Sequence, residues 1–361
     1  MSFSEIKHLA SLNAYVPGEQ PQESGWIKLN TNENCFPPSP KVSAAIQKAL
    51  PTLGLYPDPD CQELRSKVAS FHKLDKNQVI IGNGSDDLLN LLFRAYTDKN
   101  NDAAMLDPSY SHYPVLSEIQ GSRIIKIPLT DDLDLDVKTL KNTQANILFL
   151  TSPNAPLSFG FSNQKLKEVV ENFEGLVVID EAYADFASEN AVGLLQDYNN
   201  VFLTRTFSKS YALAGLRVGY GLGSLEVIKV LNKVRDPYNV NKLSQVGAIA
   251  ALDDLEYYQE IIHKILVTRD QLRDWILDQG WKVHASCTNF LFMEPCDESG
   301  KISGDCAKSV FEFLKKHKIL VRYFPKHSLT QKGIRVTIGT EQEMDQFKKV
   351  IMTWIEKEKL K

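Results

Sequence analysis

One lysine of this chain, Lys209, stands in a context that suggests covalent chemistry. It lies in FLTRTFSKSYALAGLRVGYGLG (202–223), where a strand-like run ends and Ser208 comes directly before the lysine. Arg217 follows eight residues later, a spacing that predicts a position near the same face of a helix. The amine can form a Schiff base with an aldehyde, while Ser208 and Arg217 can bind a phosphate dianion. The segment suits a cofactor that carries both groups, although a lone lysine is most often a solvated surface residue.

An acidic residue ends a second strand-like run, in LVVIDEAYADF (176–186). The apolar residues before Asp180 predict a buried parallel strand, whose carboxyl end faces the crevice where open α/β sheets bind ligands. A carboxylate there can pair with a protonated pyridine nitrogen and keep the ring electron-withdrawing. An acidic residue after a strand is as often a helix N-cap as a catalytic group. The catalytic interpretation of Asp180 therefore depends on its combination with the lysine segment.

A glycine-rich turn lies in VIIGNGSDDLLNLLFRAY (79–96), which predicts a strand, a tight turn and an amphipathic helix. Gly82 and Gly84 permit tight backbone geometry, and free N–H groups of Ser85 and Asp86 at the helix start would form an anion site. The alternative is an ordinary strand-to-helix turn capped by Ser85.

Together these segments resemble the fold type I pyridoxal-phosphate (PLP) aminotransferases. The pattern S-K-x-x-x-L-A-G-L-R-x-G is similar to their histidinol-phosphate aminotransferase branch, and further matches extend from SLNAYVPGE (11–19) to GIRVTIGTEQEMDQF (333–347). The resemblance implies PLP as the cofactor and Lys209, Asp180 and Tyr183 as catalytic residues. It implies that PLP is bound by Gly84, Ser85, Asp86, Tyr110, Asn154, Asp180, Tyr183, Thr206, Ser208, Lys209 and Arg217, and by Tyr56 of the partner subunit in a homodimer with shared sites.

The same resemblance assigns particular contacts. The glycine turn cups the phosphate, Tyr110 lies flat against the pyridine ring, Asp180 meets the ring nitrogen and Tyr183 meets the phenolic oxygen. One segment departs from the pattern: ILFLTSPNAPLSF (147–159) has Leu and Ser where the family has Thr and Gly. Asn154 remains available for the phenolic oxygen, but if the contact belonged to the residue before the second proline, which here is an alanine, it would be lost.

The anionic groups of a substrate need binding residues other than those that bind the cofactor phosphate. Arg335 lies in an alternating, strand-like run and Arg322 in ILVRYF (319–324), and the resemblance places both in anion binding, where a planar guanidinium is preferred over an ammonium. Tyr15 and Asn32, from the N-terminal segment that covers the site in this family, are the other expected substrate contacts. An arginine in a strand is otherwise usually a solvated edge residue, and Asn32 could equally be a turn residue.

Composition excludes several classes of function. The chain has 361 residues, 43% of them hydrophobic, and a net charge of −4, so a sizeable core is expected and a nucleic-acid or membrane partner is not. The N-terminus has no signal-like or membrane-spanning stretch. Five scattered cysteines without C-x-x-C spacing predict neither disulfides nor a metal site, and a cytoplasmic location is expected.

The alternation of apolar runs with helical patterns predicts an α/β fold. We expect three parts: an N-terminal segment (1–40) that packs on a small domain, a large PLP-binding domain (41–239) with a mainly parallel sheet, and a connector helix with a small α+β domain (240–361). The connector is expected to be one long amphipathic helical stretch within 237–280. Strands are expected near 79–81, 103–106, 123–128, 147–150, 176–179, 201–204 and 218–221, and in the small domain near 282–283, 289–293, 321–323 and 335–338.

The function implied by the resemblance is transamination in two half-reactions between histidinol phosphate and 2-oxoglutarate or glutamate, in histidine biosynthesis. Three alternatives remain open at this point. One is a related PLP enzyme, either a broad-specificity aromatic aminotransferase or a threonine-phosphate decarboxylase. Another is a catalytically silent PLP-binding module, which would need a DNA-binding domain for which no residues are left. The last is a structural protein without cofactor, which the combination of Lys209, Asp180 and Arg217 disfavours.

Overall fold

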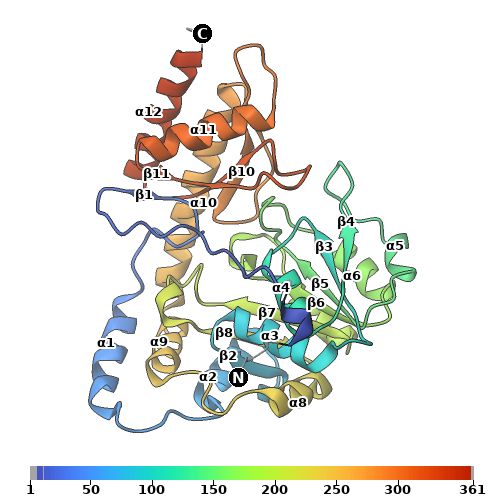
Figure 1. Ribbon diagram of the computed structural model, residues 1–361. Helices are drawn as coiled ribbons and strands as arrows, with labels where there is room; N and C mark the ends of the chain where they lie inside the picture. Colours follow the sequence, from blue (N-terminus) through green and yellow to red (C-terminus); the bar gives the residue numbers. More distant parts are fainter. Residues whose placement is uncertain (1–5, 11, 359–361) are drawn as a thin grey trace, which may run out of the picture.

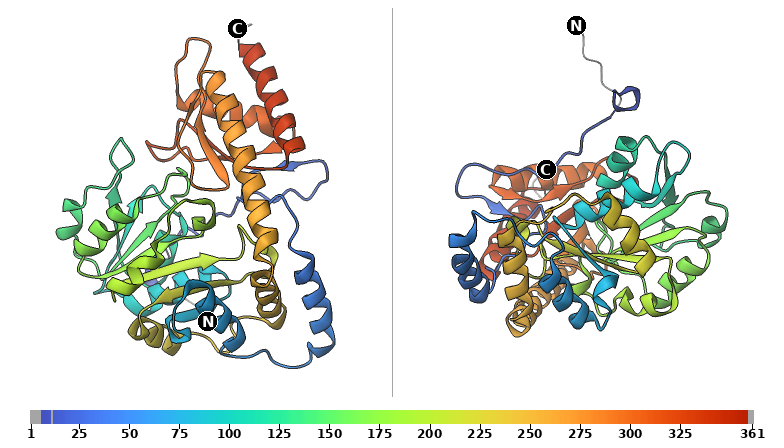
Figure 2. Two further views of the ribbon diagram at one scale, coloured as in Figure 1. Left: turned by 180° about the vertical axis from the view of Figure 1, so that it is seen from behind. Right: turned by 90° about the horizontal axis from the view of Figure 1, so that it is seen from below.

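The protein consists of a large and a small domain that are bridged by one long helix (Figure 1). The computed structural model describes residues 6–10 and 12–358. Helix α10 (Leu255–Asp278) begins against the large domain and continues into the small one, where the C-terminal helix also lies (Figure 2). With 24 residues, it is roughly 36 Å long at 1.5 Å per residue.

The large domain contains a seven-stranded sheet in the order β2-β8-β7-β6-β5-β3-β4. All neighbours pair in parallel except β8, which is antiparallel to both β2 and β7. The expected α/β fold with a mainly parallel sheet is therefore confirmed. The strands are β2 (Val79–Gly82), β3 (Ala103–Asp107), β4 (Ile124–Pro128), β5 (Ile147–Thr151), β6 (Leu176–Asp180), β7 (Val201–Thr206) and β8 (Gly219–Gly223).

Helices cover both faces of this sheet, which explains why its central strands are buried along their whole length and apolar for most of it. Every residue of β5, β6 and β7 is buried, as expected for parallel strands that pack against helices on both sides. The helices of the large domain are α1 (Pro40–Ala49), α2 (Gln62–His72), α3 (Ser85–Tyr96), α4 (His112–Ile119), α5 (Lys138–Lys141), α6 (Asn163–Glu171), α7 (Leu194–Asp197), α8 (Leu225–Val234) and α9 (Lys242–Leu252). Short 3₁₀ turns are η1 (Lys7–Leu9), η2 (Leu50–Thr52), η3 (Lys76–Gln78), η4 (Ala184–Phe186), η5 (Ala191–Gly193) and η6 (Ala214–Leu216).

The small domain has its own apolar core around an antiparallel sheet in the order β12-β13-β10-β9. A separate parallel pair joins the N-terminal strand β1 to β11, so the beginning of the chain packs on this domain. The elements are β1 (Ile27–Lys28), β9 (Lys282–Val283), β10 (Phe290–Glu294), α11 (Gly304–Lys316), β11 (Ile319–Leu320), β12 (Arg322–Tyr323), β13 (Ile334–Thr337) and α12 (Glu341–Glu358).

Two details differ from the sequence-based prediction. The connector is not one helix, because α9 ends at Leu252 and α10 starts at Leu255. At the break, the Asp254 carboxylate accepts a hydrogen bond from Ser39 and pairs with Lys41 at 2.7 Å, which fixes a bend beside α1. The strand expected near 321–323 is present as β12, but it is preceded by a second short strand, β11, which was not predicted and pairs with a different partner.

Candidate active site

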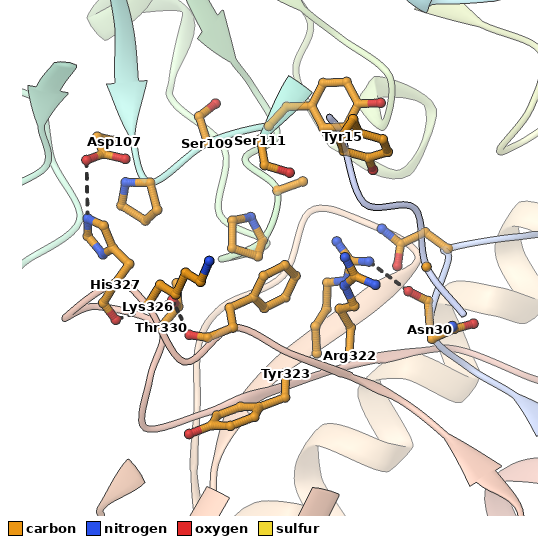
Figure 3. Close-up of a pocket in the computed structure, with 18 of the residues that line it drawn as sticks. Tyr15, Asn30, Asp107, Ser109, Ser111, Arg322, Tyr323, Lys326, His327 and Thr330 are labelled. Carbon is orange, nitrogen blue, oxygen red and sulfur yellow. Dashed lines mark hydrogen bonds and ion pairs between the residues drawn. The ribbon is translucent and has the colours of Figure 1, made fainter. Parts of the chain in front are cut away.

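A cavity of about 560 Å³ lies between the two domains. Figure 3 shows Arg322 and Asn30 at one end of it and Asp107 with His327 at the other. Seven of the residues expected at a site line the cavity, from both domains and from the N-terminal segment: Tyr15, Asn32, Tyr110, Tyr183, Lys209, Arg322 and Arg335. The chain thus brings together side chains that are more than 300 residues apart in sequence.

Lys209 lies in the turn after β7 and is held by the N-terminal segment. Its ammonium donates a hydrogen bond to the carbonyl of Thr31 at 3.2 Å and lies 5.6 Å from the ring centre of Tyr183. The Asn34 amide donates to the backbone carbonyls of Lys209 and Ser210 at 3.0 and 3.2 Å. The lysine loop is therefore fixed from outside as well as by its own turn.

Arg217 reaches Ser208, although the predicted helix between them is wrong. The segment after Lys209 forms a turn and the 3₁₀ helix η6, and Arg217 itself has a left-handed backbone with φ of +50°. Hydrogen bonds from Leu213 N to Phe207 O and from Phe207 N to Val218 O return the chain into β8 beside β7. This return leaves no room for two helical turns. The Arg217 Nη1 still lies 3.3 Å from the Ser208 hydroxyl, so the two side chains can act on one ligand.

The glycine-rich turn forms an anion cup opposite this arginine. Gly84, with φ of +85°, precedes α3, and no side chain caps the first turn of that 12-residue helix. Its free N–H groups at Ser85 and Asp86 therefore remain available to an anion. A β-carbon at Gly84 would lie 2.7 Å from the Arg217 Nη2, which shows how closely the backbone and the guanidinium approach. The Asp86 carboxylate pairs with that nitrogen at 3.2 Å.

Tyr110 lies next to the cup. Its hydroxyl donates to Asp86 at 3.1 Å, and burial together with the nearby Asp86 charge raises the pKa of the Tyr110 phenol. Its ring meets the edge of Tyr15 at 5.9 Å. Tyr110, expected beside the cofactor ring, and Tyr15, expected beside the substrate, are therefore in contact with each other.

Asp180 ends β6 as expected, and it is held by residues that the sequence did not single out. Its carboxylate accepts hydrogen bonds from the hydroxyls of Tyr113 at 2.8 Å and Thr204 at 3.1 Å, and from the Ala182 N–H at 3.2 Å. Burial raises the pKa of Asp180, and these donors oppose that shift. Thr204 carried a signal that could have been used, because it is a polar residue in an apolar strand. Tyr113 carried none.

Nine expected cofactor residues lie outside the cavity lining: Gly84, Ser85, Asp86, Asn154, Asp180, Thr206, Ser208, Arg217 and Tyr56. The hydroxyl of Thr206 accepts from the Ser208 N–H at 3.0 Å and so orders the lysine loop. Asn154 is fully buried, where it donates to the Pro108 carbonyl at 3.2 Å and accepts from the Leu157 N–H at 3.1 Å. Tyr56 lies away from this cavity and is 80% exposed.

Arg322 and Arg335 are directly opposite each other on β12 and β13. Arg335 donates to the Asn30 carbonyl at 2.9 Å, and burial lowers its pKa to about 10, so it remains protonated at neutral pH. Arg322 lies within 3.4 Å of the carbonyls of Pro17 and Val16. Among residues 6–10 and 12–358, neither guanidinium has a carboxylate partner. Two adjacent cations without a counter-charge favour binding of an anionic substrate.

Asn32 lies between the substrate end and the lysine. Its amide donates to the Tyr183 hydroxyl at 2.7 Å, and its carbonyl oxygen accepts from the Thr337 hydroxyl at 3.1 Å. The Asn289 amide in turn donates to the Asn32 backbone carbonyl at 3.1 Å. Asn32 therefore orients Tyr183 and is itself fixed by the small domain.

Within the described ranges, no cluster of His, Cys, Asp or Glu has a metal-binding arrangement, and no helix is both long and apolar enough to cross a membrane. The five cysteines lie in these ranges and are all free thiols.

A protein-family comparison agrees with this site. The description "Aminotransferase class I and II" matches residues 24–351, which include both domains and all of the cavity lining except Tyr15 and Gly18. The chain belongs to this family. Similar curated class I and II aminotransferases include the histidinol-phosphate aminotransferase of Geotalea daltonii, 42% identical over 94% of this chain and 96% of that protein, and that of Microcystis aeruginosa, 41% identical over 92% and 93%.

Solved structures of the family have the same fold. The histidinol-phosphate aminotransferase from Sinorhizobium meliloti, determined in complex with pyridoxal-5'-phosphate, has a TM-score of 0.87 at 26% identity and covers 98% of this chain and 99% of its own. An L-threonine-O-3-phosphate decarboxylase from Porphyromonas gingivalis, 19% identical, has a TM-score of 0.79 over 91% of this chain and 99% of its own. At that identity the likeness shows the fold alone.

Proposed function

We propose that this aminotransferase uses PLP to exchange an amino group between histidinol phosphate and 2-oxoglutarate, as part of histidine biosynthesis. The curated relatives with about two fifths of their residues identical carry that name over nearly their whole length. The observation that carries the proposal is the pair Arg322 and Arg335, which face the cavity without a carboxylate partner in the described part of the chain.

The residues present fit PLP. The uncapped start of α3, with Ser208 and Arg217 opposite, suits a phosphate, because backbone N–H groups and a guanidinium can share its oxygens. Asp180, buried at the end of β6, suits the ring nitrogen, and Tyr183 suits the phenolic oxygen. Asn154 remains a candidate for the same oxygen, but its amide would first have to leave its present backbone partners.

When bound, PLP supplies an aldehyde conjugated to an electron-withdrawing ring, which labilises the proton on the substrate carbon that bears the amino group. The Lys209 Nζ would accept that proton and later release it, so it would act first as a general base and then as a general acid. Asp180 keeps a negative charge beside the ring nitrogen and thereby stabilises the charge that develops in the transition state. Tyr183, fixed by Asn32, orients the cofactor for both steps.

The two arginines explain how one pocket can accept both substrates. Histidinol phosphate has a phosphate and no carboxylate, whereas glutamate has two carboxylates. A phosphate dianion can bind two guanidinium groups, and a carboxylate needs only one fork. Arg335 then serves both half-reactions, while Arg322, with Tyr15 as a further donor, serves mainly the phosphate.

Three organisational features belong to the same proposal. The protein is a homodimer in which Tyr56 of the partner subunit completes the phosphate site. Tyr56 is 80% exposed, stacks on Tyr238 at 4.7 Å and lies beside the exposed Leu53 and Leu55, which suits a surface that a second copy covers.

The working division of the chain is 1–40, 41–239 and 240–361, supported by the pairing of β1 with β11. A cytoplasmic location fits the free thiols.

A steady-state comparison of amino donors tests the function. Purified protein is assayed with histidinol phosphate, phenylalanine and threonine phosphate, each with 2-oxoglutarate, by following glutamate and carbon dioxide. We expect kcat/KM for histidinol phosphate to exceed that for phenylalanine by at least roughly a hundredfold, because phenylalanine offers no phosphate to the two arginines. A preference for phenylalanine, or release of carbon dioxide from threonine phosphate as the fastest reaction, would contradict the proposal.

A further inference from the structure

A buried group of charges lies beneath the active-site loops and has no part in the chemistry described above. Arg205 donates through Nε to Glu181 at 2.8 Å and through Nη1 to Asp185 at 3.0 Å. The other oxygen of Asp185 accepts a hydrogen bond from the Ser210 hydroxyl. Arg205 and Glu181 are 5% and 2% exposed. We call these four residues the Arg205 network.

Strand alternation places this network on the other side of β7 from the cofactor groups. Thr204 and Thr206 project to one face, and Arg205 between them projects to the opposite face. The Thr204 hydroxyl donates a hydrogen bond to Asp180. Arg205 donates to Glu181, which directly follows Asp180 in the sequence. One strand therefore contacts two consecutive acidic residues on opposite faces.

The other members are close in sequence to the remaining active-site residues. Asp185 follows Tyr183 by two residues, and Ser210 directly follows Lys209. Arg205 thus joins, through Asp185, the loop that carries Tyr183 to the loop that carries Lys209. The planar guanidinium holds two carboxylates from separate segments in a fixed geometry, whereas a lysine ammonium is a point charge on a flexible stem.

Within residues 6–10 and 12–358, no second cation pairs with the two carboxylates of the network. The His72 ring lies nearby, with its Nε2 2.9 Å from the Tyr220 hydroxyl. Burial, and then the positive charge of Arg205, lower the pKa of His72 to about 3, so it stays neutral at physiological pH. Removing the guanidinium of Arg205 therefore leaves the buried Glu181 carboxylate with the Ala191 N–H as its hydrogen-bond donor and without a cation, and leaves the partly exposed Asp185 without its ion pair.

We propose that Arg205 is a positioning residue that fixes the distance and orientation between Lys209 and the loop of Asp180 and Tyr183. This inference rests on the proposed roles of those three residues and concerns how the chain holds them. Displacement of a reacting group by about 1 Å costs on the order of a hundredfold in rate, so a loose connection between the loops should lower kcat in both half-reactions while KM changes little.

The main test is Arg205→Lys, which keeps the charge and removes the fork. We expect kcat to fall by roughly tenfold to a hundredfold for both substrates, with KM within about threefold of wild type. The visible circular dichroism of bound PLP, which reports the orientation of the cofactor and requires no turnover, should also change. An unchanged kcat and an unchanged dichroism band would overturn the proposal.

A matched control separates positioning from general loss of stability. Glu294→Gln disturbs another buried carboxylate, which lies 3.0 Å from the His284 ring and 3.5 Å from the Lys282 ammonium, in the small domain away from the cavity. It should lower the melting temperature and leave kcat and the dichroism band as in wild type. If the control lowers kcat as much as Arg205→Lys does, the effect is structural and the proposal fails.

A milder variant decides the matter if Arg205→Lys does not fold. Ser210→Ala removes only the hydroxyl that joins the lysine loop to Asp185, and we expect about a tenfold loss of kcat together with an altered dichroism band. Wild-type values for both measurements would then overturn the proposal. If wild-type protein binds PLP but does not use histidinol phosphate, the proposed function fails while the dichroism test of Arg205 remains decisive.

Discussion

Alanine at Gly84 should weaken cofactor binding selectively. A β-carbon at this position would lie 2.7 Å from Nη2 and 3.3 Å from Cζ of Arg217, which is closer than side chains tolerate. Arg217 is partly exposed and can swing away, so the clash is relieved at the expense of its contacts with Ser208 and Asp86.

The magnitude follows from two separate costs. A charge-assisted hydrogen bond contributes about 1.5–3 kcal/mol, so loss of the Arg217 contact with the phosphate should raise the Kd for PLP roughly tenfold to a hundredfold. The positive φ of Gly84, +85°, adds a backbone cost of about 1–3 kcal/mol in the free energy of unfolding for any residue with a side chain.

Gly280→Ala is the control that separates the loss of PLP affinity from the backbone cost in stability. Gly280 has φ of +79°, and a β-carbon there would meet nothing within 4 Å. Both variants should therefore lose stability, measured by thermal unfolding of the apoproteins, but only Gly84→Ala should lose affinity when the apoprotein is titrated with PLP and the visible absorbance is followed. The reasoning about the cup is refuted if Gly84→Ala binds PLP within about threefold of wild type, or if Gly280→Ala weakens binding equally.

Three further predictions concern the remaining groups. Asp180→Asn should still bind PLP but lose several orders of magnitude in kcat, because the carboxylate acts on charge that develops in the transition state; near-normal turnover would contradict its role. Arg322→Ala should raise KM for histidinol phosphate more than for glutamate, whereas Arg335→Ala should impair both half-reactions in separate single-turnover experiments. Mixed dimers of inactive Lys209→Ala and Tyr56→Ala subunits should regain activity at one of their two sites, and a monomer in light scattering would exclude this arrangement.

Most of the strand positions and the separation into sheet and small domain could be predicted from the sequence, because buried parallel strands are continuous apolar runs. The lysine, the aspartate and the glycine cup could be placed because each lies at a strand end. The path of the chain between Lys209 and Arg217 could not be predicted. A helix and a turn with a left-handed residue both bring the two side chains close, so their spacing in the sequence does not distinguish between them. Contacts such as that of Tyr113 with Asp180 depend on side-chain direction across the fold, which no local pattern encodes.

The pairing of the first strand with the last part of the chain has a consequence for synthesis on the ribosome. The hydrogen bonds of Asn32 to Thr337 and of Arg335 to Asn30 each join residues 305 positions apart. While the large domain can begin to fold as soon as its strands emerge, the N-terminal segment has no partner in the small domain until nearly the whole polypeptide has been made. Assembly of the pocket therefore requires the C-terminal strands, and a nascent chain stalled before β11 would contain both Lys209 and the N-terminal segment but not the strands on which that segment packs.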